Sequence, residues 1–135
     1  MGAHDNRRPY NCQGFAAFAA LSQGKIRGMN TPRFVHLRLH SEFSVTDGIV
    51  RIGDAIKRAA GDGMPALAVT DLGNLFGLVK LYTGARGKGV KPIAGADVWI
   101  ANPESPDDAY RLLLLVRNRT GYRQLCELLT KSYIV

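Results

Sequence analysis

Apolar and polar residues alternate along residues 34–40 of this chain. The aliphatic positions are Val35, Leu37 and Leu39, and the basic positions between them are His36, Arg38 and His40. A period of two places the aliphatic side chains on one face of a β-strand and the basic side chains on the other. We therefore predict a short strand at residues 34–39 that ends in polar side chains. Polar groups at a strand end are typical of the catalytic rim of an α/β protein.

Further apolar patterns predict three more strands and three helices. Helical spacing of apolar residues predicts helices at about 49–60 and 75–86, and a last helix that opens at Thr120-Gly121. Short apolar runs predict strands at residues 66–70, 93–100 and 111–116. The expected order is β-α-β-α-β-β-α. Because strands alternate with helices, we expect a mainly parallel sheet with right-handed crossovers, and all four strands as members of one parallel set.

The first two helices carry more detailed expectations. Ile49 lies on the apolar stripe of the first helix, and Asn74 is expected to be the N-cap of the second. The buried side of the second helix is predicted to consist of Leu75, Leu78, Val79 and Tyr82.

Composition indicates one modest globular domain. The chain has 135 residues, of which 46% are hydrophobic and 21% charged, and its net charge of +7 suits contact with an anionic partner. Its apolar runs are far shorter than the roughly 20 residues that span a bilayer, so no membrane segment is expected. Cys12 and Cys126 have no metal or redox spacing, which favours free thiols and a cytoplasmic protein.

Residues 1–28 differ from the rest of the chain. They carry four basic side chains against one acidic side chain, and the apolar run from Phe15 to Leu21 is short and lacks a clear cleavage site. We therefore expect residues 1–28 to be a disordered or non-native extension, with Met29 as an alternative start. Residues 29–135 form the expected domain.

Three polar clusters fall at or near predicted strand ends. They are Arg38 and His40 with Asp47, then Asp71 after Thr70, and Asp97. In a β/α barrel the strand ends converge on one mouth, so these residues could build one site. His40 with the three carboxylates could hold Zn, Mn or Fe. Alternatively, Asp47 and Asp71 only cap turns and helix starts.

Several ordered motifs make the chain resemble a known family. Residues 36–44 read His-Leu-Arg-Leu-His-Ser-Glu-Phe-Ser, residues 63–71 read Gly-Met-Pro-Ala-Leu-Ala-Val-Thr-Asp, and residues 89–97 read Gly-Val-Lys-Pro-Ile-Ala-Gly-Ala-Asp. With Asp47-Gly48, Asn74-Leu75 and residues 118–122, these resemble the PHP (polymerase and histidinol phosphatase) domain in the form found at the N-terminus of bacterial DNA polymerase III alpha subunits. The resemblance implies an α/β fold: the first part of a PHP-type distorted β/α barrel with a mainly parallel strand set, incomplete in this chain.

The resemblance also implies a degenerate metal site. Metal-binding members carry His-x-His, then Asp, then Thr-Asp-His, then Gly-x-Glu. The corresponding positions here are Arg38, His40, Asp47, Asp71, Leu72 and Asp97. Leucine cannot ligate a metal, and arginine stays protonated and brings its own positive charge. We therefore expect no metal and no catalytic residue here, and Arg38 paired with Asp47, Asp71 or Asp97.

By this resemblance the chain is a noncatalytic fragment of a replicative DNA-directed DNA polymerase. Its implied partners are the proofreading exonuclease subunit, the remaining polymerase III holoenzyme subunits, and DNA through the full-length protein. The family uses Mg in the full-length polymerase and Zn or Mn in metal-binding PHP relatives, and no cofactor is expected in this fragment. The polymerase carboxylates are absent from these 135 residues, so the fragment is expected to be inactive alone.

Two alternatives stay open at this point. The chain could be a small metal-dependent PHP phosphoesterase or nuclease, which its metal content would reveal. It could also be a nucleic-acid-binding module, although only its net charge favours this and no aromatic-rich basic motif is present.

Overall fold

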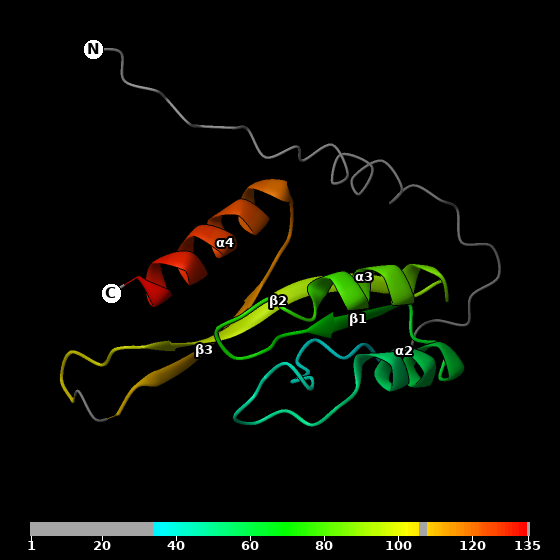
Figure 1. Ribbon diagram of the computed structural model, residues 1–135, viewed down its shortest axis with the longest axis horizontal. Helices are drawn as coiled ribbons and strands as arrows, with labels where there is room; N and C mark the ends of the chain where they lie inside the picture. Colours follow the sequence, from blue (N-terminus) through cyan, green and yellow to red (C-terminus); the bar gives the residue numbers. More distant parts are fainter. Residues whose placement is uncertain (1–33, 106–107, 135) are drawn as a thin grey trace, which may run out of the picture.

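The computed structural model describes residues 34–105 and 108–134. Its helices and strands follow one another as shown in Figure 1: α2 (Ile52–Gly61), β1 (Ala66–Val69), α3 (Leu78–Arg86), β2 (Lys91–Ile100), β3 (Tyr110–Leu115) and α4 (Arg119–Tyr133). The expectations for residues 1–28, Cys12 and Met29 lie outside the described residues. In the part that is described, no helix is long and apolar enough to cross a membrane.

The sheet has the order β1-β2-β3 and mixes two strand directions. β1 and β2 are parallel, with Val69 opposite Ala94, whereas β2 and β3 are antiparallel, with Asp97 opposite Leu113. The prediction that residues 111–116 join the parallel set was therefore wrong. Residues 101–109 are too few for the crossover of a dozen or more residues that a parallel connection needs, so the chain returns as a hairpin.

Residues 34–39 run beside β1 in the parallel direction. Ala68 N donates to His36 O at 2.9 Å, and Thr70 N donates to Leu39 O at 2.8 Å. His36 and Leu67 form an isolated parallel bridge rather than a continuous ladder. The predicted first strand is thus present as an extended segment with the predicted direction, and the mainly parallel α/β fold class is confirmed.

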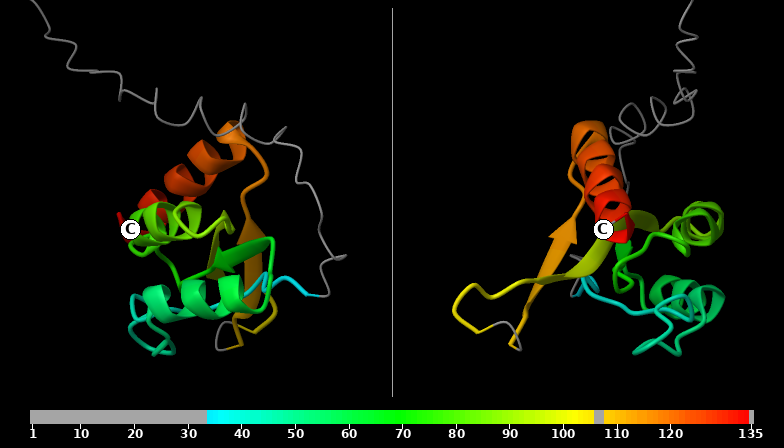
Figure 2. Two further views of the ribbon diagram at one scale, coloured as in Figure 1. Left: turned by 90° about the vertical axis from the view of Figure 1, so that its right-hand side faces the viewer. Right: turned by 60° about the vertical axis from the view of Figure 1, so that its left-hand side comes forward.

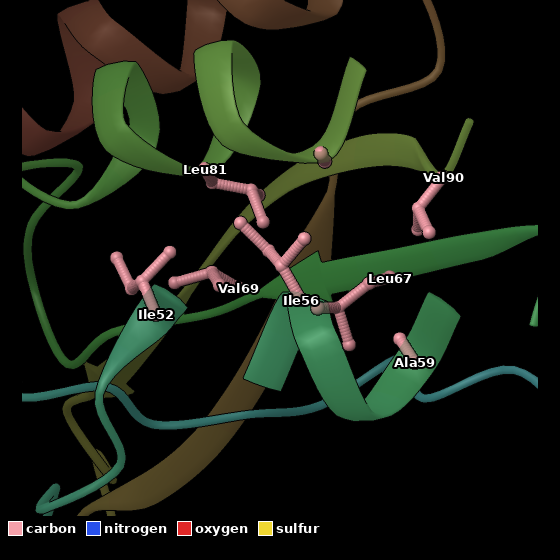
Figure 3. Close-up of a cluster of buried hydrophobic side chains, with 8 residues drawn as sticks. Ile52, Ile56, Ala59, Leu67, Val69, Leu81 and Val90 are labelled. Carbon is pink, nitrogen blue, oxygen red and sulfur yellow. The ribbon is translucent and has the colours of Figure 1, made fainter. Parts of the chain in front are cut away.

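Helices α2 and α3 bury one face of β1. Ile52 and Ile56 of α2 point toward Leu67 of β1 and Leu81 of α3, as Figure 3 shows, and all four are at most 2% exposed. Full burial of such a side chain contributes about 1.5–3 kcal/mol. This cluster fixes the position of β1, whose carboxyl end leads into the candidate site.

Helix α4 packs on β2 through a second cluster of Ala96, Leu125 and Leu129. Ala96 lies two residues beyond Ala94, the partner of Val69, so α4 covers the same face of the sheet as α2 and α3. In the right-hand view of Figure 2, α2 and α3 lie together and α4 stands apart from them. Asp97, at the next position, lies on the opposite face, away from the helices.

The helix boundaries differ from the expected ones in two places. Ile49 is 94% exposed and precedes α2, which begins at Ile52. Asn74 does not cap α3, because its Oδ1 accepts from Phe76 N at 3.1 Å in a turn ahead of the helix. Val79 is 74% exposed. Leu75 and Leu78 do pack against the hydrophobic clusters, and α3 also buries Leu81 and Ala85.

The last helix begins close to its predicted start. Asn118 is the N-cap of α4, and its side chain accepts from Gly121 N at 2.9 Å. This contact satisfies one of the free N–H groups at the helix start.

Candidate functional site

The candidate site lies where the parallel strands end. Residues 34–39, β1 and β2 run in the same direction, so their carboxyl ends meet at one edge. Asp97 N donates to Asp71 O at 3.2 Å, which places the backbones of the two acidic positions side by side. His40 and Asp97 also approach within 2.7 Å. His40 and Asp97 therefore meet through their side chains, whereas Asp71 adjoins Asp97 only through its backbone.

Asp97 is the centre of an ionic network. Its side chain is fully buried, and its Oδ2 accepts from Arg38 Nε at 2.9 Å and from Arg38 Nη2 at 2.6 Å. His40 Nε2 lies 2.7 Å from the same oxygen, and Arg111 Nε lies 3.3 Å from it. Asp97 Oδ1 is buried and has no hydrogen-bond partner within the described residues. Of the three acidic partners proposed for Arg38, Asp97 is the one it contacts.

His40 connects Asp97 to Asp47. Its Nδ1 lies 2.9 Å from Asp47 Oδ2, while its Nε2 faces Asp97. Both ring nitrogens therefore point at carboxylates.

Asp47 is held in its ionised form. The Ser44 hydroxyl donates to its Oδ1 at 2.6 Å, and the Arg111 guanidinium donates to its Oδ2. These two hydrogen bonds, Ser44 first, lower the pKa of Asp47 from its ordinary value of 3.8 to about 2. Asp47 is thus a permanent negative charge beside His40 and Arg111 at neutral pH.

Arg111 belongs to the site although no sequence motif marked it. Arg111 is the second residue of β3 and lies directly opposite Trp99, and its guanidinium lies 5.1 Å from the centre of the Trp99 ring. The antiparallel register puts it diagonally across from Asp97 on the same face. Only that register reveals the contact, and a parallel β3 would not place Arg111 there.

Asp71 is buried but has a separate role. Its Oδ1 accepts from Ser41 N at 2.6 Å and its Oδ2 from Ser41 Oγ at 2.8 Å. It faces the helices, because a Cβ added to Gly77 would lie 3.2 Å from its Oδ2. Asp71 therefore fixes the turn that follows His40 and stands apart from the ionic network.

Leu72 lies beside the network without joining it. Leu72 and Asp97 form a parallel bridge, and Leu72 N donates to Ser44 Oγ at 2.9 Å. Ser44 thus joins the backbone after β1 to Asp47. Ser41 and Ser44 are both fully buried, and no sequence pattern predicted a role for either.

The side chains present do not fit a resident metal. Two guanidinium groups approach Asp97 Oδ2, and both nitrogens of His40 face carboxylates. Leu72 stands where the resemblance described above leads one to expect a further histidine ligand. Across residues 34–105 and 108–134 no group of three or more His, Cys, Asp or Glu side chains is arranged to hold a metal ion. Positive charge in this site comes from the protein's own side chains.

An apolar groove of about 800 Å³ lies between the β2–β3 hairpin and α4. Trp99, Leu112, Leu128 and Tyr133 are among its walls, and each is at least 41% exposed.

Comparison with known proteins places this geometry in a family. The PHP domain family model matches residues 36–135. The chain is 52% identical over 106 residues to the DNA polymerase III subunit alpha of Neisseria meningitidis serogroup B, and 48% identical over 105 residues to that of Escherichia coli K12. In both cases the match covers 78% of this chain and 9% of the relative, so the chain spans about a tenth of the length of these relatives.

One solved structure shows the same fold. It is an amidohydrolase from Chromobacterium violaceum with bound sulfate and no metal, with a TM-score of 0.56 and 22% identity. The similarity covers 72% of this chain and 32% of that one. At this identity it supports a shared barrel-type fold.

Proposed function

Because the chain belongs to the PHP domain family, we propose that it is the N-terminal part of the PHP domain of a replicative DNA polymerase III alpha subunit. In this role it is a noncatalytic, metal-free scaffold that acts in DNA replication in the cytoplasm. The identity of about half of the aligned residues to alpha subunits from several bacteria supports this assignment.

The contact between Arg38 and Asp97 carries the proposal of a metal-free site. Arg38 stands where metal-binding PHP members have the first histidine, and two of its nitrogens contact the buried Asp97 carboxylate. A guanidinium stays protonated at any pH a cell reaches. The carboxylate is thereby neutralised without a metal ion.

In this proposal the site has a structural role. The proposed partners are the proofreading exonuclease subunit, the other polymerase III holoenzyme subunits, and DNA bound through the full-length protein. The relatives' name, DNA polymerase III subunit alpha, supports a place in this assembly. Nucleotide transfer and its Mg ions belong to the parts of such a polymerase outside these 135 residues.

Calorimetric titration with Zn²⁺ and Mn²⁺ tests the metal-free proposal. The 135-residue chain should show no tight stoichiometric binding. Tight one-to-one binding that is lost in His40→Ala would show that the site is a working metal centre. Co-purification of the tagged chain with the exonuclease subunit tests the scaffold role. If an alpha subunit from which this region has been deleted still binds the exonuclease subunit, the scaffold role is wrong.

A metal-dependent phosphoesterase is the second candidate. The approach of His40 to both Asp47 and Asp97 favours it, because imidazole and carboxylate groups are metal ligands in such enzymes. Phosphatase activity with added Mn²⁺, abolished in Asp97→Ala, would establish it.

A further inference from the structure

Arg111 differs from Arg38 in the number of carboxylates it contacts. The guanidinium of Arg111 donates to Asp47 and lies 3.3 Å from Asp97 through Nε. Arg38 contacts Asp97, and no contact between Arg38 and Asp47 is found among the described residues. Of the two arginines, Arg111 is therefore the one that joins the loop containing Asp47 to strand β2.

The fold holds Arg111 in this position. Its backbone is fixed in the antiparallel ladder opposite Trp99, and its guanidinium lies over the Trp99 ring. A cation over an aromatic face is stabilised by the ring quadrupole. The planar fork of the guanidinium can direct different N–H groups at two carboxylates at once. Only 29% of the Arg111 side chain is exposed, so water screens these contacts less than it would at the open surface.

Arg111 lies beside two carboxylates that are close to each other. Asp47 and Asp97 both lie within 3 Å of a nitrogen of the single His40 ring, and two close carboxylates repel each other unless positive charge separates them. Arg111 supplies one positive charge that is covalently part of the chain. Arg38 is 52% exposed and contacts Asp97 through Oδ2.

We infer that Arg111 is the built-in cation of this site: it performs the crosslink between the Asp47 loop and β2 that a bound metal ion performs when ligands from separate segments share it. This inference deepens the proposed metal-free role of the same site and rests on it. The expected consequence is a β2–β3 hairpin fixed to the segment of residues 41–50. That segment contains turns and isolated bridges, and its own secondary structure holds it only weakly.

Hydrogen–deuterium exchange of the 135-residue chain tests the inference. Arg111→Gln removes the charge and keeps a polar side chain of similar shape. We expect amides of residues 42–50 to exchange at least about tenfold faster, while amides of α2 and α3 keep their protection. Arg123→Gln is the matched control, because Arg123 is exposed on α4 and outside the network. It should change neither region.

Unchanged exchange of residues 42–50 in Arg111→Gln would overturn the assignment to Arg111. Tight Zn²⁺ binding by the unmodified chain would instead overturn the proposed metal-free function.

Arg111→Lys provides a second test of the inference if Arg111→Gln does not fold. Lysine retains the charge but has no planar fork to reach both carboxylates. Amides of residues 42–50 in Arg111→Lys should therefore be less protected than in the unmodified chain, but should keep part of their protection. Protection equal to that of the unmodified chain would contradict a bridging role.

Discussion

Arg38 and Asp97, which are 59 positions apart in the chain, meet through two hydrogen bonds of 2.9 and 2.6 Å to a single carboxylate oxygen. The acidic partner is fully buried and the basic partner is half exposed. The pair therefore brings a negative charge into the interior together with its own counter-ion. A buried charge without such a partner is strongly unfavourable.

Removing the Arg38 charge should destabilise the fold. Arg38→Gln leaves the buried Asp97 with His40 and Arg111, and we expect a loss of about 1–3 kcal/mol in the free energy of unfolding. Urea denaturation would measure it. Arg58→Gln is the matched control, because the Arg58–Asp62 pair lies on the surface with Arg58 82% exposed. Such a pair contributes at most about 1 kcal/mol. Equal effects of the two substitutions would contradict a special role for Arg38.

Acid should weaken the loop that contains Asp47. The pKa of Asp47 is about 2 in the folded chain, against an ordinary value of 3.8. A carboxyl whose pKa is lowered on folding stabilises the fold above its unfolded pKa, and that contribution disappears as the pH falls through the folded pKa. We expect the free energy of unfolding to fall between pH 3.8 and about 2. Asp47→Asn should flatten this part of the curve, and an identical slope in both proteins would refute the assignment.

The order of helices and strands was predictable from the sequence because the spacing of apolar residues indicates which side chains are buried. The short run of residues 66–70 reads as a strand covered on both sides, and β1 is buried along its whole length. Strand direction was harder to predict. The β2–β3 pair turned out antiparallel because the connection is short, and apolar runs alone carry no direction.

The candidate site was only partly visible in the sequence for the same reason. Arg38, His40 and Asp97 stand in motifs, whereas Arg111 reaches Asp97 through a diagonal that exists only in an antiparallel pair. Asp71 sits in a motif as well, but its position one residue before Leu72 turns its side chain to the other face of the chain.

The buried Ser41 hydroxyl should contribute as much to the free energy of unfolding as many apolar core side chains. It donates to Asp71 Oδ2 at 2.8 Å inside the protein. Ser41→Ala leaves that oxygen unpaired, so we expect a loss of about 1–3 kcal/mol in thermal or urea unfolding. Ser105→Ala removes a hydrogen bond to Asp108 at the surface and should change stability by less than about 0.5 kcal/mol. A neutral Ser41→Ala would mean that the hydroxyl bond to Asp71 does not stabilise this turn.

Restoring a metal centre should require removing Arg111 as well as rebuilding the ligands. Arg38→His, Leu72→His and Asp97→Glu together recreate the family's ligand types. Leu72 pairs with Asp97 in a parallel bridge, so a histidine there would lie beside the new glutamate. The guanidinium of Arg111 would still face these ligands, and its positive charge repels a divalent ion.

We therefore expect the triple variant to bind Zn²⁺ or Mn²⁺ weakly at most, and the further change Arg111→Gln to tighten binding by at least about tenfold, equivalent to 1.4 kcal/mol. Calorimetric titration of both variants would measure the difference, with His40→Ala added to each as the control for binding elsewhere. The same changes in a longer protein that contains the whole barrel should bind more tightly still, because more ligands are available and their geometry is fixed. If the triple variant already binds as tightly as the quadruple one, Arg111 does not occupy the position of a cation in this site.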